Sequence, residues 1–209
     1  MKTSIFECKV RLFIEAMKRK FPPGAVTSVE FLRTLGFSQS SIARCVTSGQ
    51  LAPEPRARGL YTITGRELSR HHDLMVVALY SPSTTFCLLT ALQLLELRAP
   101  APDIWLTISA SARMPSFRLL PIIPIRPREA IDRTDVQVME IDGIKLRYTN
   151  AAKTLADCFQ FRSKVGLDVA VAALHAARQT GVVTMDEIWR CAVASGVGGV
   201  MLPYLEAVG

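Results

Sequence analysis

The stretch from Thr27 to Ile63 constrains the fold more than any other part of the chain. Thr27 followed by Glu30 is a capping-box pair that predicts the start of one helix, and Ser38 predicts the start of a second. Gly36 between them can take the left-handed conformation that ends a helix. Two short helices joined by a tight turn are therefore expected. Their buried faces are expected to carry apolar side chains: Phe31, Leu32 and Leu35 in the first helix, and Ile42, Ala43 and Val46 in the second.

A small hairpin is expected to follow these helices, with two hydrophobic arms and a basic tip. Together the elements predict a winged helix-turn-helix, in which the second helix enters the major groove of DNA. The hairpin is then the wing, which contacts phosphate or the minor groove. The residues expected to bind DNA are those of the open helix face and of the wing: Gln39, Ser40, Ser41, Arg44, Thr47, Arg56, Arg58 and Tyr61.

The charge of the chain is concentrated in the same region. Residues 1–70 hold twelve Lys and Arg against five acidic residues, whereas the remaining residues hold thirteen of each. The whole formal net charge of +7 therefore belongs to the segment that is predicted to bind DNA. A clustered basic excess is typical of a phosphate-binding surface. A helical module that docks a protein is the alternative, and it leaves this excess unexplained.

The amino-terminal residues predict an amphipathic helix. Phe6, Val10, Phe13 or Ile14, and Met17 recur at helical spacing, without the apolar core of a signal peptide. We expect this helix to pack on the helix-turn-helix; a wider DNA footprint or a dimer contact is the alternative.

Composition and spacing exclude several classes of protein. The five cysteines are odd in number and far apart, so they predict reduced thiols in a cytoplasmic protein and no metal or cofactor site. Residues 74–95 carry no charge, but Ser81-Pro-Ser-Thr-Thr divides them into pieces too short to span a membrane. No membrane association is expected.

The second half of the chain predicts a small sheet flanked by helices. Strands are expected at residues 103–108 and 120–126, and a hairpin is expected at residues 136–148 around Asp142-Gly143. Residues 86–97, capped by Ser83 or Thr84, are expected to form a helix. Further helices are expected at residues 151–161, at 165–178 as a fully buried helix, from Thr184 to residue 194, and at 201–206. The predicted fold class is thus α+β, with a winged helix-turn-helix in residues 1–70 and a mixed domain in residues 71–209.

Several short motifs resemble one family when their order and spacing are taken together. They are Gly59-Leu-Tyr, Phe86-Cys-Leu-Leu-Thr-Ala-Leu, Ile141-Asp-Gly, Lys153-Thr-Leu-Ala-Asp-Cys-Phe, Arg162-Ser-Lys-Val-Gly-Leu-Asp-Val-Ala and Pro203-Tyr-Leu-Glu-Ala. The chain resembles the AbiEi-type antitoxins over residues 25–207. These proteins are the transcriptional-regulator half of a type IV toxin–antitoxin system linked to bacterial phage defence.

The resemblance implies an autorepressor that binds inverted repeats in double-stranded DNA upstream of its own operon. It also implies an antitoxin that counters a nucleotidyltransferase-like toxin, with or without direct contact, and it allows for a homo-oligomer. The candidate antitoxin surface is a charged series in the second half: Lys153, Asp157, Arg162, Lys164 and Asp168. Local ion pairing and helix capping are the alternative explanation for this series.

Catalytic motifs are missing from the sequence. Glu140, Asp142 and Lys145 come closest to a nuclease cluster, but their spacing is wrong and they lie on a predicted hairpin tip. The chain also lacks a Gly-Ser with a following Asp-x-Asp pair and a phosphate-binding glycine loop. We therefore expect no enzyme activity; a metal-dependent nuclease that a winged helix delivers to DNA is the alternative.

Overall fold

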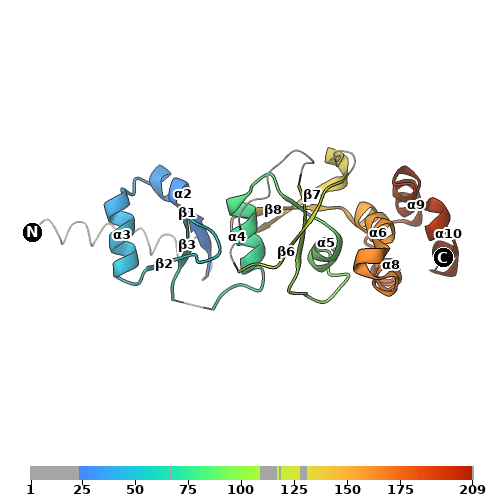
Figure 1. Ribbon diagram of the computed structural model, residues 1–209, viewed down its shortest axis with the longest axis horizontal. Coiled ribbons are helices and arrows are strands. Elements are labelled where there is room, and N and C mark those ends of the chain that lie inside the picture. Colours follow the sequence, from blue (N-terminus) through green and yellow to red (C-terminus); the bar gives the residue numbers. More distant parts are fainter. Residues whose placement is uncertain (1–23, 66, 109–116, 118, 128–130, 209) are drawn as a thin grey trace, which may run out of the picture. The chain divides into compact units, whose positions relative to one another are not determined.

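The computed structural model describes residues 24–65, 67–108, 117, 119–127 and 131–208. The helix that was expected near the amino terminus lies outside these residues. The described part of the chain is a mixture of helices and small sheets, arranged in two compact units (Figure 1). The first unit extends to Ser83 and includes the later segment Glu140–Leu146, whereas the sequence predicted a boundary at residue 70. The second unit contains most of the remaining residues.

The first unit combines a small antiparallel sheet with short helices. Its elements follow in the order β1 (Val26–Ser28), α2 (Val29–Thr34), α3 (Gln39–Thr47), β2 (Leu51–Pro53), β3 (Leu60–Ile63) and α4 (His72–Tyr80). Strand β3 lies between β1 and β2, with Val26 opposite Thr62 and Leu51 opposite Ile63. Because α4 contacts both β1 and β3, the unit continues past the predicted boundary.

The two helix starts of this unit differ in how well they follow the prediction. Ser38 caps α3 as expected, with its Oγ accepting from the backbone N–H of Ser41 at 3.2 Å. Gly36 has the expected left-handed conformation, with φ at +86°. The prediction for Thr27 was wrong, because Thr27 belongs to β1 and pairs with Tyr61. Ser28 caps α2 instead, one residue later.

The core of the first unit is built from both helices and from the sheet. Its buried members are Ala25, Leu32, Ile42, Cys45, Leu51 and Ile63. Phe31 and Leu35 were expected in this core, but their side chains are 41% and 44% exposed. Helix α2 has only six residues, so a single position, Leu32, reaches the interior. The prediction that Ala43 of α3 is buried was also wrong. Ala43 is exposed, and Cys45 lies on the buried face of the helix.

The second unit is organised on a mixed sheet with the strand order β6-β5-β4-β8-β7. Its strands are β4 (Thr85–Phe86), β5 (Ile104–Thr107), β6 (Ile122–Ile125), and the parts of β7 (Val136–Ile141) and β8 (Ile144–Thr149) that lie outside Glu140–Leu146. Its helices are α5 (Leu88–Leu94), the short η1 (Arg133–Asp135), α6 (Ala151–Gln160), α7 (Arg162–Val165), α8 (Leu167–Thr180), α9 (Met185–Ala194) and α10 (Gly198–Val208). Strand β4 runs antiparallel to β5 and parallel to β8, and β5 runs parallel to β6.

The sequence pattern predicted the β7–β8 hairpin correctly and strand β4 incorrectly. The β7–β8 hairpin is confirmed, and positive φ angles of 54° at Asp142 and 79° at Gly143 make its two-residue turn. The helix expected from Phe86 begins two residues later. Phe86 is a strand residue that pairs with Leu106 and Tyr148, so neither Ser83 nor Thr84 caps the helix.

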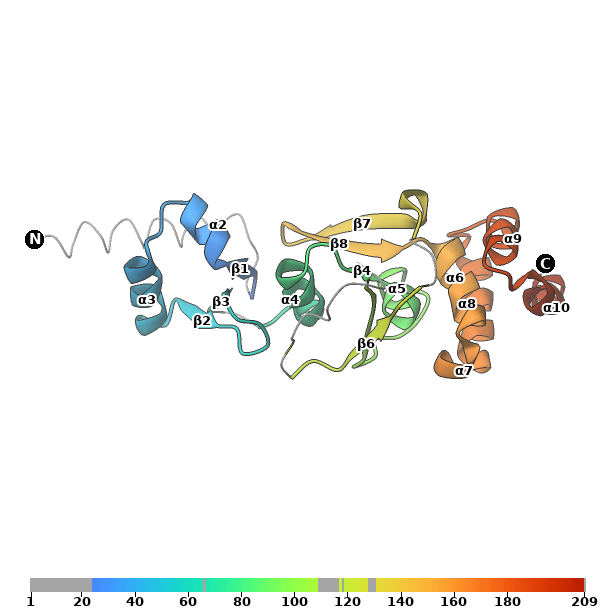
Figure 2. The ribbon, with the colours of Figure 1, turned by 45° about the horizontal axis from the view of Figure 1, so that its top comes forward.

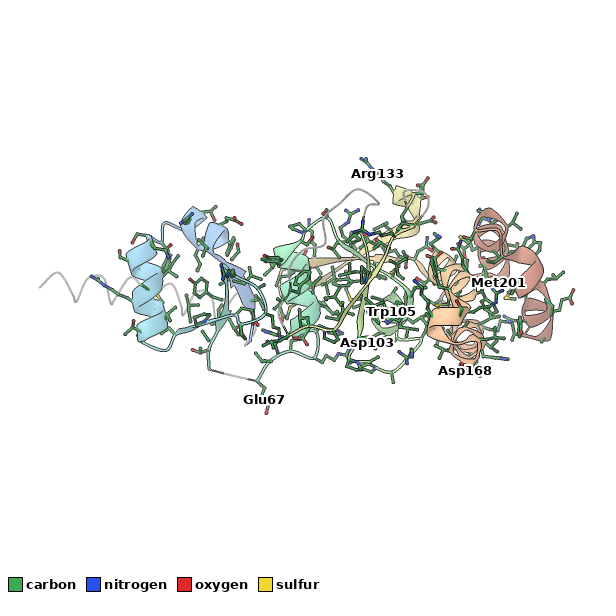
Figure 3. All side chains as sticks on the ribbon, in the orientation of Figure 1. Glu67, Asp103, Trp105, Arg133, Asp168 and Met201 are labelled. Carbon is green, nitrogen blue, oxygen red and sulfur yellow. The ribbon has the colours of Figure 1, made fainter. Side chains whose placement is uncertain are left out.

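The helices of the second unit gather around α6, which contacts α5, α8 and α9 (Figure 2). Their shared core contains Trp105, Phe159, Leu174 and Met201, and Figure 3 shows Trp105 among interior side chains. The capping box between Thr184 and Glu187 starts α9 as predicted. Helix α8 was expected to be fully buried, but its buried residues form one stripe: Ala170, Ala173, Leu174 and Ala177.

Candidate nucleic-acid interface

Helix α3 presents a polar face opposite its buried side. Ile42 and Cys45 point into the core of the first unit and hold the helix against α2 and the sheet. Four of the expected DNA-binding residues lie on the exposed side of the helix: Gln39, Ser40, Arg44 and Thr47. Ser40, Arg44 and Thr47 follow one another at intervals of four and three residues, which places them along one stripe. Their side chains can donate to and accept from base edges and phosphates.

Two other residues of the expected set, Ser41 and Tyr61, are less exposed than these four. Ser41 is 9% exposed, and its Oγ lies 2.9 Å from the Oγ of Ser38, which caps the helix. Its hydroxyl therefore supports the start of α3 and does not belong to the open face. Tyr61 is half-buried and packs against the core of the first unit.

The hairpin between β2 and β3 carries the two arginines that were expected to contact phosphate. Arg58 is exposed at its tip and has no ion-pair partner among the described residues. Arg56 has two partners, because its Nη1 lies 2.9 Å from Oε1 of Glu54 and its Nε lies 3.1 Å from Oδ1 of Asp73. Among the described residues, Arg58 therefore has no carboxylate partner, whereas the charge of Arg56 is already neutralised by Glu54 and Asp73.

Glu54 is the centre of a buried polar network beneath the hairpin. Its carboxylate accepts hydrogen bonds from Arg56, from the Thr62 hydroxyl at 3.1 Å and from Nε2 of His72 at 2.9 Å. Since an ionised carboxylate only accepts, Nε2 of His72 carries the proton in this pair. Burial raises the pKa of Glu54, but the hydrogen bonds from Arg56, His72 and Thr62 outweigh it, so the pKa lies below its ordinary value. The network ties the hairpin to the first turn of α4.

Sequence reasoning missed this network. Nothing in the sequence next to Glu54 or His72 predicts that these two side chains meet. Glu54 and His72 are 18 residues apart, so no local spacing could have joined them. The available signal was a single carboxylate at the end of a strand next to a proline and two arginines.

The excess of Lys and Arg over acidic residues in residues 1–70 lies partly within and partly outside the residues that the structure describes. Residues 1–20 hold six Lys and Arg against two acidic residues, and they lie outside the described region. In residues 24–65 the arginines are Arg33, Arg44, Arg56 and Arg58, of which only Arg56 is not exposed. The polar face of α3 and the hairpin tip are therefore lined by exposed positive charge within the first unit.

The charged series expected to form an antitoxin surface separates into two groups. Lys153 and Asp157 form an ion pair within α6, with side chains 19% and 10% exposed. Lys153 also lies 3.5 Å from Oγ of Ser195, at the end of α9. Burial raises the pKa of Asp157, and Lys153 offsets part of this effect. The ion pair that the alternative explanation expects between Lys153 and Asp157 is therefore present.

The other three members of the series are exposed. Arg162 donates from Nη1 to the carbonyl of Phe159 at 3.0 Å, and Nζ of Lys164 lies 5.8 Å from the centre of the Phe161 ring. Asp168 lies in the first turn of α8 and points outward in Figure 3. These residues can contact a partner, whereas the Lys153–Asp157 pair holds α6 and α9 together.

Among the described residues, no group of three or more His, Cys, Asp or Glu side chains could hold a metal ion. Of the four described cysteines, Cys45, Cys87 and Cys158 are buried, and burial raises the pKa of each thiol. Such thiols are poor nucleophiles at neutral pH. Over the described ranges, the helices are too short or too polar to cross a membrane.

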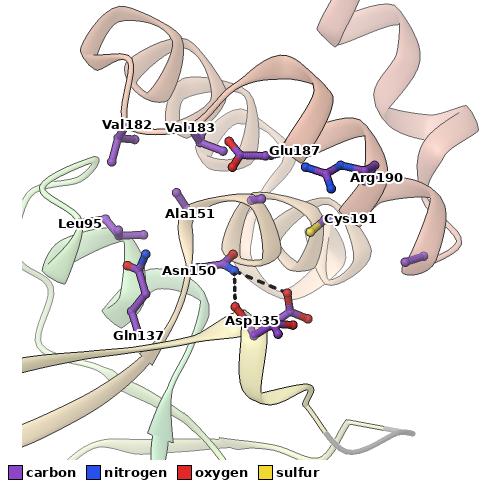
Figure 4. A pocket seen from close by; sticks show the side chains of 13 residues that line it. Leu95, Asp135, Gln137, Asn150, Ala151, Val182, Val183, Glu187, Arg190 and Cys191 are labelled. Carbon is purple, nitrogen blue, oxygen red and sulfur yellow. Dashed lines mark hydrogen bonds between the residues drawn. The ribbon is translucent and has the colours of Figure 1, made fainter.

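A cavity of the second unit with a volume of about 450 Å³ lies beside α9 (Figure 4). Its walls carry both charged and apolar side chains, including Asp135, Arg190, Leu95 and Val183. No protein-family model matches the sequence, and no curated protein is significantly similar to it.

Proposed function

We propose that this protein is a sequence-specific DNA-binding repressor whose first unit is a winged helix-turn-helix. The observation that carries the proposal is the polar face of α3, with Gln39, Ser40, Arg44 and Thr47 exposed on a helix whose other side is fixed in the core. Helix α3 is the second helix of the tight pair, which is the one that a helix-turn-helix places in the major groove.

The wing is supported by the strand arrangement around α3. The order β1-β3-β2 places the hairpin next to the helix pair within one unit, and Arg58 lies exposed at its tip. We assign base contacts to Gln39, Ser40 and Arg44, and phosphate contacts to Thr47 and Arg58. We leave Arg56 out of the interface, because Glu54 and Asp73 already neutralise its guanidinium.

We further propose that the chain acts in the cytoplasm as the antitoxin of a type IV toxin–antitoxin system. In this proposal the first unit represses the operon by occupying its operator and needs no catalytic step. The second unit counters a nucleotidyltransferase-like toxin, with Arg162, Lys164 and Asp168 as the exposed part of its charged series. The support is the order and spacing of the motifs shared with AbiEi-type antitoxins.

A gel-shift titration tests the repressor proposal. The labelled probe is the DNA upstream of the protein's own gene, the competitor is a scrambled duplex, and the titration is made at two salt concentrations. Binding that resists the competitor in the wild type and loses this preference in Arg44→Ala supports the proposal. Equal binding to both duplexes, or no binding, overturns it.

A growth assay tests the antitoxin proposal separately. The neighbouring reading frame is expressed alone and together with this chain in a host that lacks both. Growth arrest that is relieved by co-expression supports the antitoxin role, and arrest that persists at full co-expression contradicts it. The Lys153→Met variant is the control for lost stability. Lys153 is largely buried in the second unit, so this variant shows how far a weakened fold alone reduces the relief of growth arrest.

A further inference from the structure

The cavity beside α9 is lined by residues from several elements of the second unit. Its wall includes Leu95 after α5, Asp135 at the end of η1, Gln137 of β7 and Arg190 of α9 (Figure 4). Asn150, which caps α6, forms the floor and donates to the carbonyl of Thr134 at 3.2 Å. A volume of about 450 Å³ lies within the range of pockets that bind ligands. It is large enough for a few residues of an extended chain.

Two opposite charges on this wall are not paired. Arg190 donates from Nε only to the backbone carbonyl of Asp186, at 3.4 Å, and has no ion-pair partner in the described part of the chain. Among the described residues, the side chain of Asp135 accepts only from Nδ2 of Asn150, at 3.5 Å. The third charged residue, Glu187, is already bound by the backbone and hydroxyl of Thr184. Among the described residues, the cavity therefore offers one guanidinium and one carboxylate that are not in an ion pair, although the charge of Arg190 also helps to lower the pKa of Glu187.

Within the part of the chain that the structure describes, the main chain of β7 beside the cavity is paired on one side only. Strand β7 is at the edge of its sheet, and within the described residues its only neighbour in the sheet is β8. Gln137 and Val138 are exposed, with Val138 at 53%. An uncovered edge strand presents unpaired N–H and C=O groups to which an extended chain can add.

We propose that this cavity and the adjoining edge of β7 dock an extended peptide segment of a partner protein. An acidic side chain of the peptide pairs with Arg190, and a basic side chain pairs with Asp135. An apolar side chain enters between Leu95 and Val183, and the peptide backbone adds to β7. This is peptide recognition by strand addition, in which the main chain supplies affinity and side-chain pockets supply specificity.

The charges of the cavity distinguish a peptide from a nucleic acid. Asp135 and Glu187 place two carboxylates next to one guanidinium, so a phosphate backbone would meet more repulsion than attraction. A peptide can match each charge with a side chain of opposite sign. The inference does not depend on the proposed repressor function, because its residues belong to the second unit.

The probe for the test is a phage-displayed library of random octapeptides, selected on the full-length protein. Selected sequences are synthesised with a fluorophore, and their affinity is measured by fluorescence anisotropy. Arg190→Glu is compared with Arg178→Glu, a matched control on α8 whose Nε also contacts one backbone carbonyl, that of Val208 at 3.2 Å. Both arginines are exposed, so both variants are expected to fold.

The expected result is a family of peptides that share one acidic position. Arg190→Glu should weaken their binding at least tenfold, Arg178→Glu should leave it unchanged, and a peptide with Lys at the acidic position should restore binding to Arg190→Glu. Hydrogen exchange of the β7 amides should slow when the peptide is bound. Restoration by the exchanged charge is a result that a merely structural role of Arg190 would not produce.

Three results would overturn the proposal. The first is a library without enriched peptides, and the second is a set of peptides that binds Arg190→Glu as tightly as the wild type. The third is a duplex or single-stranded DNA whose binding depends on Arg190 while no peptide is enriched, which would assign the cavity to nucleic acid. Operator binding by Arg190→Glu should equal that of the wild type, which keeps this test separate from the repressor proposal.

Discussion

Replacing Glu54 by glutamine should destabilise the first unit while leaving the second unit unchanged. The substitution keeps the shape of the side chain and removes the charge that Arg56 and His72 share. Removing one partner of a buried ion pair costs about 3–5 kcal/mol when the other charge is left buried and unpaired, whereas Arg56 is 25% exposed and keeps Asp73 as a partner. The glutamine oxygen can still accept from Arg56, so we expect the lower value, a loss of about 3 kcal/mol in the free energy of unfolding.

Tryptophan fluorescence cannot follow this loss, since Trp105 and Trp189 both belong to the second unit. Native-state hydrogen exchange can measure the loss of stability, because it reports the opening of β3 and α4 separately from the opening of β5. Exchange of the β3 and α4 amides should accelerate about a hundredfold in Glu54→Gln, which corresponds to about 3 kcal/mol. Exchange in β5 should not change. The control is Glu67→Gln, an exposed residue whose replacement should change stability by less than about 0.5 kcal/mol.

The same network predicts a pH dependence of definite sign. The folded pKa of Glu54 is lower than its unfolded value, which is about 4.3. The contribution of Glu54 to stability is therefore complete above that pH and is lost as the pH falls through the folded pKa. The difference in stability between wild type and Glu54→Gln should shrink as the pH is lowered from 6 to 3. A difference below about 1 kcal/mol at pH 6, or one that grows on acidification, would refute the reasoning.

Three further outcomes are expected. Arg44→Ala should weaken binding to the cognate operator by about 1–3 kcal/mol and binding to random duplex much less, as measured by competition titration, if Arg44 pairs with guanine. Arg58→Ala should reduce the slope of log affinity against log salt by about 0.9, whereas Arg56→Ala should leave the slope unchanged, because Arg56 is paired within the protein. Leu174→Ala should cost the second unit about 2–5 kcal/mol in urea unfolding followed by tryptophan fluorescence.

Each of these outcomes has a result that contradicts it. Equal weakening on both duplexes would make Arg44 a phosphate contact and not a base contact. A lower salt slope for Arg56→Ala would mean that its ion pairs open on DNA. A small effect of Leu174→Ala would show that the interior around α8 closes over the missing side chain.

The features that the sequence predicted correctly depend on neighbouring residues. The Ser38 cap, the left-handed Gly36 and the box between Thr184 and Glu187 each need contacts within three residues. The turn at Asp142-Gly143 needs only two residues that accept positive φ angles. Such features are determined by local backbone energetics, so the pattern of the sequence was enough to locate them.

The features that only the tertiary structure decided depend on residues far apart in the chain. Thr27 and Phe86 could have begun helices, but pairing with Tyr61 and Leu106 made them strand residues. The same applies to the candidate sites. Arg56 and Arg58 are alike in sequence, and only the fold brings Asp73 to one of them while leaving the other exposed. The sequence determines the chemical groups of a side chain. Whether that side chain can bind a ligand depends on which partners the fold brings next to it.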